Sequence, residues 1–220
     1  MQAPVIFVAL GILILGGIFI LVRHFDRKRL EALEAVARGL DLRFQLKDTD
    51  KTHKNLEQFH LFSQGHGKRL SSIMRGSAQG IELMICDYRY TVGGGKNSHT
   101  YRQTVVLFSS ERLNLPGFTL RPQNFFHKIG KAFGYSDIDF DSYPDFSGRY
   151  LLRGENENAV RMIFKNPVIK FFEGSDKLCC EGIGDQLLVY RGGKRVKPEL
   201  IDDFLGQGFE VFGLLGRQDG

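Results

Sequence analysis

Residues 81–109 decide the fold; they read IELMICDYRYTV, then GGGKNSH, then TYRQTVVLFS. In the first run Leu83 and Ile85 would face one side of a strand and Met84 the other, because successive side chains alternate. Two apolar runs joined by a short glycine-rich turn are typical of a β-hairpin. Both strands carry apolar residues on both faces at their far ends, so we expect this hairpin to lie centrally in a covered sheet.

The rest of the chain adds a second hairpin and a set of single helices. Strands are expected at residues 40–46, 69–76 and 150–152, and the second hairpin at 177–190. Helices are expected at residues 30–39, 122–133, 155–165, 166–172 and 198–215. Because strands come in hairpins and helices come singly, the predicted fold class is α+β, an antiparallel sheet covered by helices, rather than a doubly wound parallel sheet.

The beginning of the chain carries a long apolar run. Residues 4–22 read PVIFVALGILILGGIFILV, without one charged side chain. A helix of this run, at ~1.5 Å per residue, would extend roughly 28 Å, close to the thickness of the hydrocarbon core of a bilayer. No basic residue precedes it and no small-x-small cleavage site follows it, which favours an uncleaved anchor over a signal peptide. The sequence therefore predicts a transmembrane helix at residues 4–22.

Basic residues next to this run set the expected orientation. Arg23, Arg27, Lys28 and Arg29 all follow it, and we expect them at the membrane surface, near anionic lipid head groups. The positive side stays inside, so the N-terminus would face out. The expected organisation is a single-pass protein of the bacterial inner membrane, with a juxtamembrane basic segment and short helix at residues 23–40 and a cytoplasmic α+β domain at 41–216, with a join between two subdomains near 137–148.

Charge and cysteine usage narrow the class of protein. Residues 23–29 hold four basic residues and one acid, which is +3 of the total net charge of +5. The remainder is too small for the basic stripe of a nucleic-acid-binding domain, and no nucleic-acid partner is expected. The cysteines are Cys86, Cys179 and Cys180, an odd number with two adjacent. This pattern indicates reduced thiols packed in a core rather than a disulfide framework.

The glycine-rich turn at residues 93–98, GGGKNS, invites comparison with a phosphate-binding loop. The Walker pattern fails here, because Tyr90 stands where a glycine is needed and Asn97 where serine or threonine is needed. The pattern also requires a helix next, whereas residues 100–108 have the alternation of a strand. A nucleotide-binding P-loop is therefore excluded.

Charged residues around this hairpin end could still gather and hold an anion. They are Asp87, Arg89, Lys96, His99 and Arg102. Consecutive glycines expose backbone N–H groups, and glycine tolerates the positive φ angles that an anion-binding turn needs. The alternative is a solvated hairpin tip in which Asp87 pairs with an arginine.

No pattern of metal ligands stands out. The acidic run at residues 137–145, DIDFDSYPD, lacks the glycine and glutamate of an EF-hand, since Ser142 and Gly148 occupy those positions. We interpret it as a turn that buries Ile138 and Phe140, and leave open whether it binds a cation. The histidines show no HExxH spacing and the cysteines no CxxC spacing, so neither a metal nor a cofactor is expected.

Four stretches between residues 62 and 154 carry a resemblance. They are FSQGHGKR, DYRYTVGGGKNSHTYRQTV, LRPQNFFHKIG and DIDFDSYPDFSGRYLLRG. In these stretches the chain resembles bacterial membrane-anchored proteins of unknown function. The resemblance implies an inner-membrane protein and assigns no catalytic residue.

Two functions remain open. The first is a non-enzymatic binding or scaffold domain, held at the membrane by residues 4–22 and meeting a protein partner there; it is favoured because no catalytic motif occurs. The second is a membrane-tethered enzyme, or a sensor of an anion or nucleotide, that uses the hairpin end at residues 87–102. A deep polar cleft at that end would favour the second.

Overall fold

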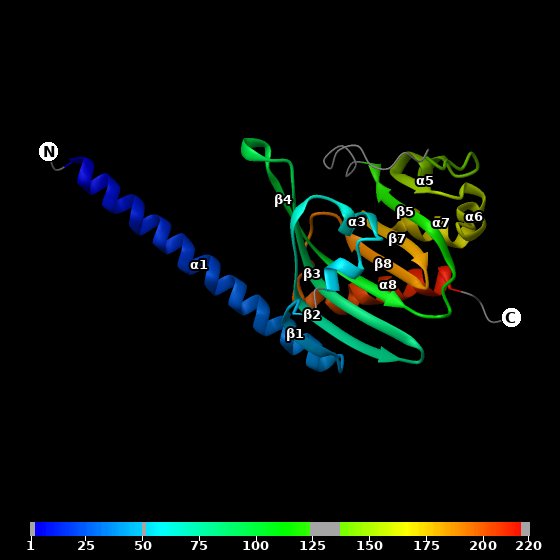
Figure 1. The fold of residues 1–220 in the computed structure, drawn as a ribbon, viewed down its shortest axis with the longest axis horizontal. Helices are drawn as coiled ribbons and strands as arrows, with labels where there is room; N and C mark the ends of the chain where they lie inside the picture. The colour runs from blue at the N-terminus through cyan, green and yellow to red at the C-terminus, as the bar shows by residue number, and fades with distance from the viewer. Residues whose placement is uncertain (1–2, 50–51, 124–136, 217–220) are drawn as a thin grey trace.

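One large antiparallel sheet organises the molecule. The structure, a computed structural model, describes residues 3–49, 52–123 and 137–216. Within these residues eight strands form a single sheet in the order β1-β2-β3-β4-β8-β7-β5-β6, and neighbouring strands are antiparallel throughout. Helices flank the sheet, and α1 extends far from the body (Figure 1).

The central hairpin is formed by β3 (Ile81–Val92) and β4 (His99–Ser109), joined by the short 3-10 helix η1 (Gly95–Asn97). The two strands pair from Glu82 opposite Ser109 to Val92 opposite His99. β2 (His66–Ala78) continues the sheet on one side, followed by β1 (Arg43–Lys47). The predicted hairpin is therefore present and lies inside the sheet.

The second hairpin, β7 (Leu178–Gly184) and β8 (Gln186–Arg191), joins the first through β8 and β4. β5 (Leu115–Pro122) and β6 (Tyr150–Gly154) complete the sheet. The sequence analysis did not predict β5, whose residues LPGFTLRP look like a turn. It is a strand because β6 and β7 supply pairing on both of its sides, with a register shift between Leu115 and Phe118 that accommodates the glycine.

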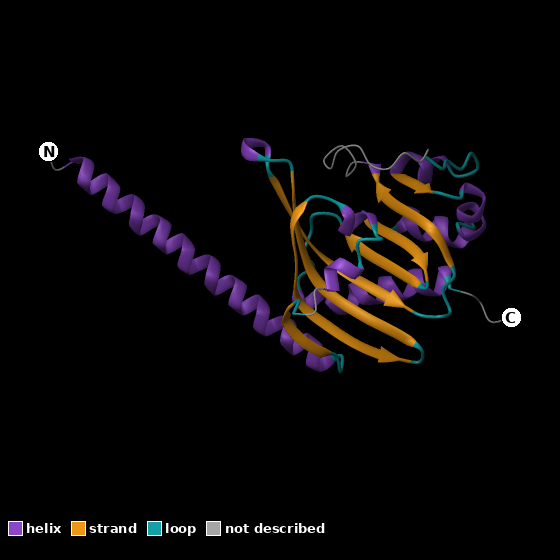
Figure 2. Ribbon diagram, viewed as in Figure 1, coloured by secondary structure: helices purple, strands orange, loops and turns teal. Residues whose placement is uncertain are grey.

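The remaining helices are short and cover the sheet (Figure 2). Their bounds are α2 (Thr52–Asn55), α3 (His60–Ser63), α5 (Pro144–Arg149), α6 (Glu157–Ile163), α7 (Asn166–Gly174), η2 (Pro198–Leu200) and α8 (Ile201–Leu215). The helix expected at residues 122–133 falls almost wholly outside the described residues.

The sheet has an apolar core on each face. One face, here the α1 face, packs the second half of α1 and α8 against alternate strand residues such as Ile85 and Phe108. The other, the α3 face, buries Phe62 under the intervening strand residues such as Tyr88. All three cysteines are free and buried, and Cys179 and Cys180 lie on opposite faces, as their strand alternation predicted.

Helix α1 corrects the expectation of a membrane anchor. It is one continuous helix, Ala3–Gly39, that passes from the apolar run through the basic segment and packs Leu33 and Ala37 into the core. Among the described residues, no helix combines the length and the apolar character needed to cross a membrane.

The predictions that depended on a membrane anchor are wrong as well. The transmembrane helix at residues 4–22 in the predicted fold class, the single-pass membrane assignment, and the inner-membrane location with its cytoplasmic domain are not supported. The short helix expected at residues 30–39 is the end of α1 rather than a separate element. The structure supports an eight-stranded antiparallel sheet with flanking helices.

Candidate anion-binding site

Three arginines lie side by side on the α1 face of the sheet. Arg69 of β2 pairs in register with Arg89 of β3, and Arg89 pairs with Arg102 of β4. Directly opposite residues share a face, so the three side chains leave the sheet on the same side. With strands about 4.8 Å apart, the row is roughly 10 Å across. We call these three residues the arginine row.

The arginine row has no acidic partner within the described residues. None of its three side chains makes a hydrogen bond or ion pair there, and the Nε of Arg89 is buried without an acceptor. Like charges directly opposite one another on adjacent strands are destabilising. A buried unsatisfied N–H costs further free energy. The row is therefore an arrangement that an anionic group would stabilise.

A polar hollow opens beside the row. Arg69, Arg89 and Arg102 line it together with Arg195, from the segment between β8 and η2, and its volume is about 320 Å³. The acids on its wall are Asp26 and Asp87. A second hollow lies along α1. It shares Asp26, Ser71, Asp87 and Arg195 with the first hollow, and it is also lined by Arg23, Arg27 and Arg29. The two hollows together present a predominantly cationic surface.

Asp87 does not neutralise the row, because its carboxylate is already occupied. Arg29 of α1 donates from Nη2 to both oxygens at 3.0 Å and from Nε to Oδ2 at 3.2 Å. Thr104 donates to Oδ1 at 2.7 Å. The pair is nearly buried, with 16% of the Arg29 side chain and 10% of the Asp87 side chain exposed. The alternative of Asp87 paired with an arginine is thus what the structure has.

This pair also fixes the walls of the site. Arg29 Nη1 donates to the carbonyl of Val196 at 2.8 Å, and the Val196 N–H donates to Thr104 Oγ1 at 2.9 Å. Helix α1, strand β4 and the segment that carries Arg195 are therefore joined through one network. Charge-assisted bonds of this kind are among the stronger ones in proteins.

The structure brings together three of the five predicted site residues and separates the other two. Asp87, Arg89 and Arg102 line one hollow. Lys96 lies in η1 at the hairpin tip and is exposed. His99 is at an odd position on β4, so it faces the α3 side, where its ring contacts Tyr101 at a centroid distance of 4.5 Å.

Sequence reasoning missed Arg69, Arg195 and the role of Arg29. Arg69 precedes Arg89 by one complete strand and turn, so their alignment depends on register and leaves no local signal. Arg29 was expected at a membrane surface, but it points into the protein at Asp87. Of its neighbours, Arg27 pairs with Glu31 at 3.0 Å, Arg23 lies over the ring of Phe19, and Lys28 is exposed. Contact of these side chains with lipid head groups stays a prediction.

A cluster of charged and polar side chains around Arg121 lies buried on the α3 face. Arg121 of β5 pairs with Glu181 of β7 at 2.8 Å, with 6% and 1% of their side chains exposed. The Tyr190 hydroxyl donates to Glu181 Oε1 at 2.7 Å, and the Leu61 N–H donates to Oε2 at 3.2 Å. Both carboxylate oxygens are thus occupied. Burial raises the pKa of Tyr190, so its hydroxyl stays protonated and donates.

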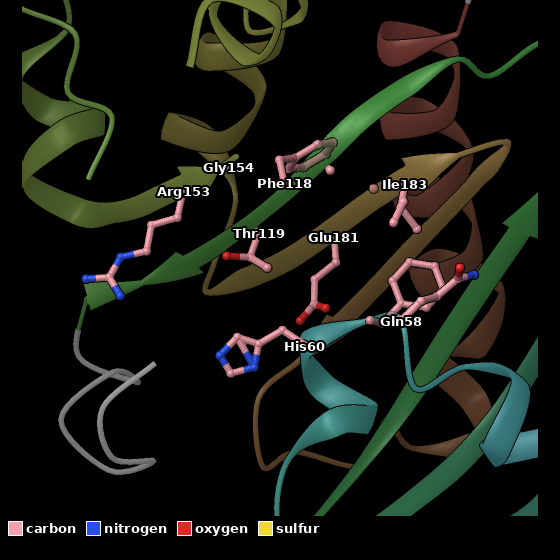
Figure 3. A pocket seen from close by; sticks show the side chains of 11 residues that line it. Gln58, His60, Phe118, Thr119, Arg153, Gly154, Glu181 and Ile183 are labelled. Atoms are coloured by element: carbon pink, nitrogen blue, oxygen red, sulfur yellow. The ribbon is translucent and has the colours of Figure 1, made fainter. Parts of the chain in front are cut away.

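His60 borders this cluster at a small cavity between α3, β5 and β7. Figure 3 shows Glu181, Thr119 and His60 directed into the same space, with Phe118 and Ile183 on its apolar wall. Burial, and then the nearby Arg121, lower the pKa of His60 to about 4, so the ring is neutral at pH 7. The charges here are compensated by the protein itself.

The acidic run at residues 137–145 is used for local structure. Asp137 pairs with Arg153 at 2.5 Å, and Ile138 is buried. The carbonyl of Asp139 accepts from Arg161 at 2.8 Å. Within the residues that the structure describes, no group of three or more histidine, cysteine or acidic side chains is placed to hold a metal ion.

Comparison with known proteins gives a fold relationship. No protein-family model and no curated protein matches the chain. The fold is similar to that of the mycobacterial trehalose monomycolate transport factor A, TtfA, in a crystal structure, with a TM-score of 0.61 over 88% of this chain and 99% of that one. The sequences are 11% identical, so the likeness is one of fold alone. It names no family for this chain.

Proposed function

We propose that this chain is a non-enzymatic binding domain that holds an anionic group of its partner in the hollow lined by the arginine row and Arg195. The observation that carries the proposal is the convergence of four arginines on one cavity without an acidic partner among the described residues. Arginine suits this role, because its planar guanidinium presents several donors to carboxylate or phosphate oxygens.

The environment of the hollow supports the proposal. The carboxylate of Asp87 already accepts hydrogen bonds from Arg29 and Thr104, so it does not compete with an incoming anion for the arginine row. The buried Nε of Arg89 has no protein acceptor, and a bound anion would provide one. The likeness to TtfA, described as a transport factor, is compatible with a binding or scaffold role for this chain.

The test uses inorganic pyrophosphate and the full chain. Pyrophosphate should raise the thermal midpoint of the wild-type protein, because it binds only the folded state. Arg89→Ala and Arg102→Ala should each remove most of this rise while leaving the midpoint without ligand nearly unchanged. Differential scanning fluorimetry across a pyrophosphate titration measures both quantities.

Arg112→Ala is the matched control. Arg112 is an exposed arginine in the turn after β4, at the opposite end of that strand from Arg102. This variant should retain the wild-type response. If wild type shows no response, or if Arg112→Ala loses it as fully as Arg89→Ala, the proposed site is wrong.

A further inference from the structure

The arginine row ends at an open strand edge. β4 pairs with β3 along its whole length, but with β8 only from Val105 to Ser109. The first half of β4 therefore has no strand on its other side within the described residues. Figure 1 shows this end of the β3–β4 hairpin projecting beyond the body of the sheet.

The hydrogen-bond pattern identifies which backbone groups face the open edge. The Thr104 N–H donates outward to Lys194 at 3.3 Å, and the Ser110 N–H donates outward to Asp185 at 2.9 Å. Backbone groups alternate sides along a strand, so the N–H and C=O of Thr100 and Arg102 also point outward. Both residues are exposed. Unpaired edge groups of this kind are a template for an added strand.

The same alternation dictates what an added strand would carry. A residue directly opposite Arg102 places its side chain on the α1 face, at the end of the arginine row. Because the row runs across the strands, residues two positions away on an added strand share this face but lie about 7 Å from the row along the strand. The residues between them fall on the α3 face, which at this level presents Tyr101. A matching segment therefore has an acidic residue opposite Arg102 and apolar residues on either side of it.

We propose that the partner binds as an extended acidic segment of a protein, which adds to the free edge of β4 at Thr100 and Arg102 and places a carboxylate beside Arg102, at the end of the arginine row. This inference rests on the proposed function, and it adds the partner class and the mode of binding. Backbone pairing with β4 gives affinity, and the row selects for an acidic residue opposite Arg102. The charge of the row complements such a segment and opposes a basic one.

The test uses a fluorescein-labelled peptide of alternating valine and aspartate, Val-Asp-Val-Asp-Val-Asp-Val, and the full chain. Fluorescence anisotropy should show binding to wild type and to Arg112→Glu, and binding weakened about tenfold or more by Arg102→Glu. The same peptide with its three aspartates replaced by asparagine should bind much more weakly, because it places no carboxylate beside Arg102.

Backbone methylation separates strand pairing from attraction between charges. N-methylation of the central aspartate removes an N–H that faces β4, and should abolish binding. N-methylation of the adjacent valine removes an N–H that faces away from β4, and should be tolerated. Hydrogen exchange should show the amides of Thr100 and Arg102 protected only in the complex.

The possible outcomes distinguish this inference from the proposed function. If pyrophosphate binds and the peptide does not, the anion site stands and the strand addition is wrong. Equal binding of the two methylated peptides would also overturn strand addition, since charge alone would then suffice. Binding of anionic phospholipid vesicles without binding of the peptide would assign the row to phosphate head groups instead. If neither pyrophosphate nor peptide binds, both proposals fall.

Discussion

The arginine row and the Arg121 cluster, on opposite faces of the sheet, differ in how their charge is compensated. On the α3 face Arg121 is buried and meets Glu181, which is itself held by Tyr190 and the Leu61 N–H. On the α1 face Arg89 and Arg102 stand in a row at a hollow, and Asp87, one of the two carboxylates on the wall of that hollow, is bound to Arg29. The same residue type is thus self-compensated in one place and uncompensated in the other.

Arginine content alone therefore does not identify a binding site. A buried charge must be paired within the protein, because leaving it unpaired costs several kcal/mol. A charge at an open hollow can remain hydrated until a partner arrives. The α3-face cluster is therefore expected to determine stability, and the arginine row to determine binding.

Breaking the buried pair should have the largest effect. Arg121→Met leaves the Glu181 carboxylate buried without its counter-charge, and we expect the free energy of unfolding to fall by about 3–5 kcal/mol. Urea denaturation measures it. The double variant Arg121→Met, Glu181→Leu should regain a large part of the loss, because no charge then remains buried. A loss below about 1 kcal/mol in the single variant would show that Arg121 and Glu181 do not form a buried pair on which stability depends.

Lowering the pH should reduce the free energy of unfolding, because His60 is buried as a neutral ring on the α3 face. The folded-state pKa of His60 is about 4, against 6.5 in the unfolded chain. Between these values the unfolded state binds the proton and the folded state does not, so stability falls as the pH falls from 6.5 towards 4. The contribution of His60 to the loss between pH 7 and pH 5 should be about 2 kcal/mol. His60→Gln should show a smaller loss over this interval in urea denaturation, and an equal loss in both proteins would contradict the buried neutral state.

The arginine row should show the smallest effect on stability. Arg102 is exposed and makes no ion pair within the described residues, so Arg102→Ala should change the free energy of unfolding by no more than about 0.5 kcal/mol. Relief of repulsion from Arg89 could make the change a gain. Urea denaturation in buffer without phosphate measures it. A loss as large as that of Arg121→Met would mean that Arg102 is structural and would erase the contrast between the two faces.

Several parts of the site could be predicted from the sequence because they depend on near neighbours. Alternation along residues 81–92 indicated a strand, and the glycine-rich turn indicated a hairpin, so Asp87, Arg89 and Arg102 were expected to share one end of it. Lys96 and His99 were expected there too, but Lys96 lies at the projecting tip and strand alternation turns His99 to the α3 face. The transmembrane assignment of residues 4–22 is wrong, because this run is the first part of α1 and no helix among the described residues is long and apolar enough to cross a membrane.

Local sequence patterns were enough to predict the antiparallel hairpins, the alternation that puts Cys179 and Cys180 on opposite faces, and the position of the glycine-rich turn. Three features became evident only in the folded molecule: β5 is a strand, Arg29 pairs with Asp87, and Arg69 joins the row. The physical reason is the range of the interactions. Alternation and turns follow from backbone geometry over a few residues, whereas cross-strand neighbours follow from register between segments far apart in the chain.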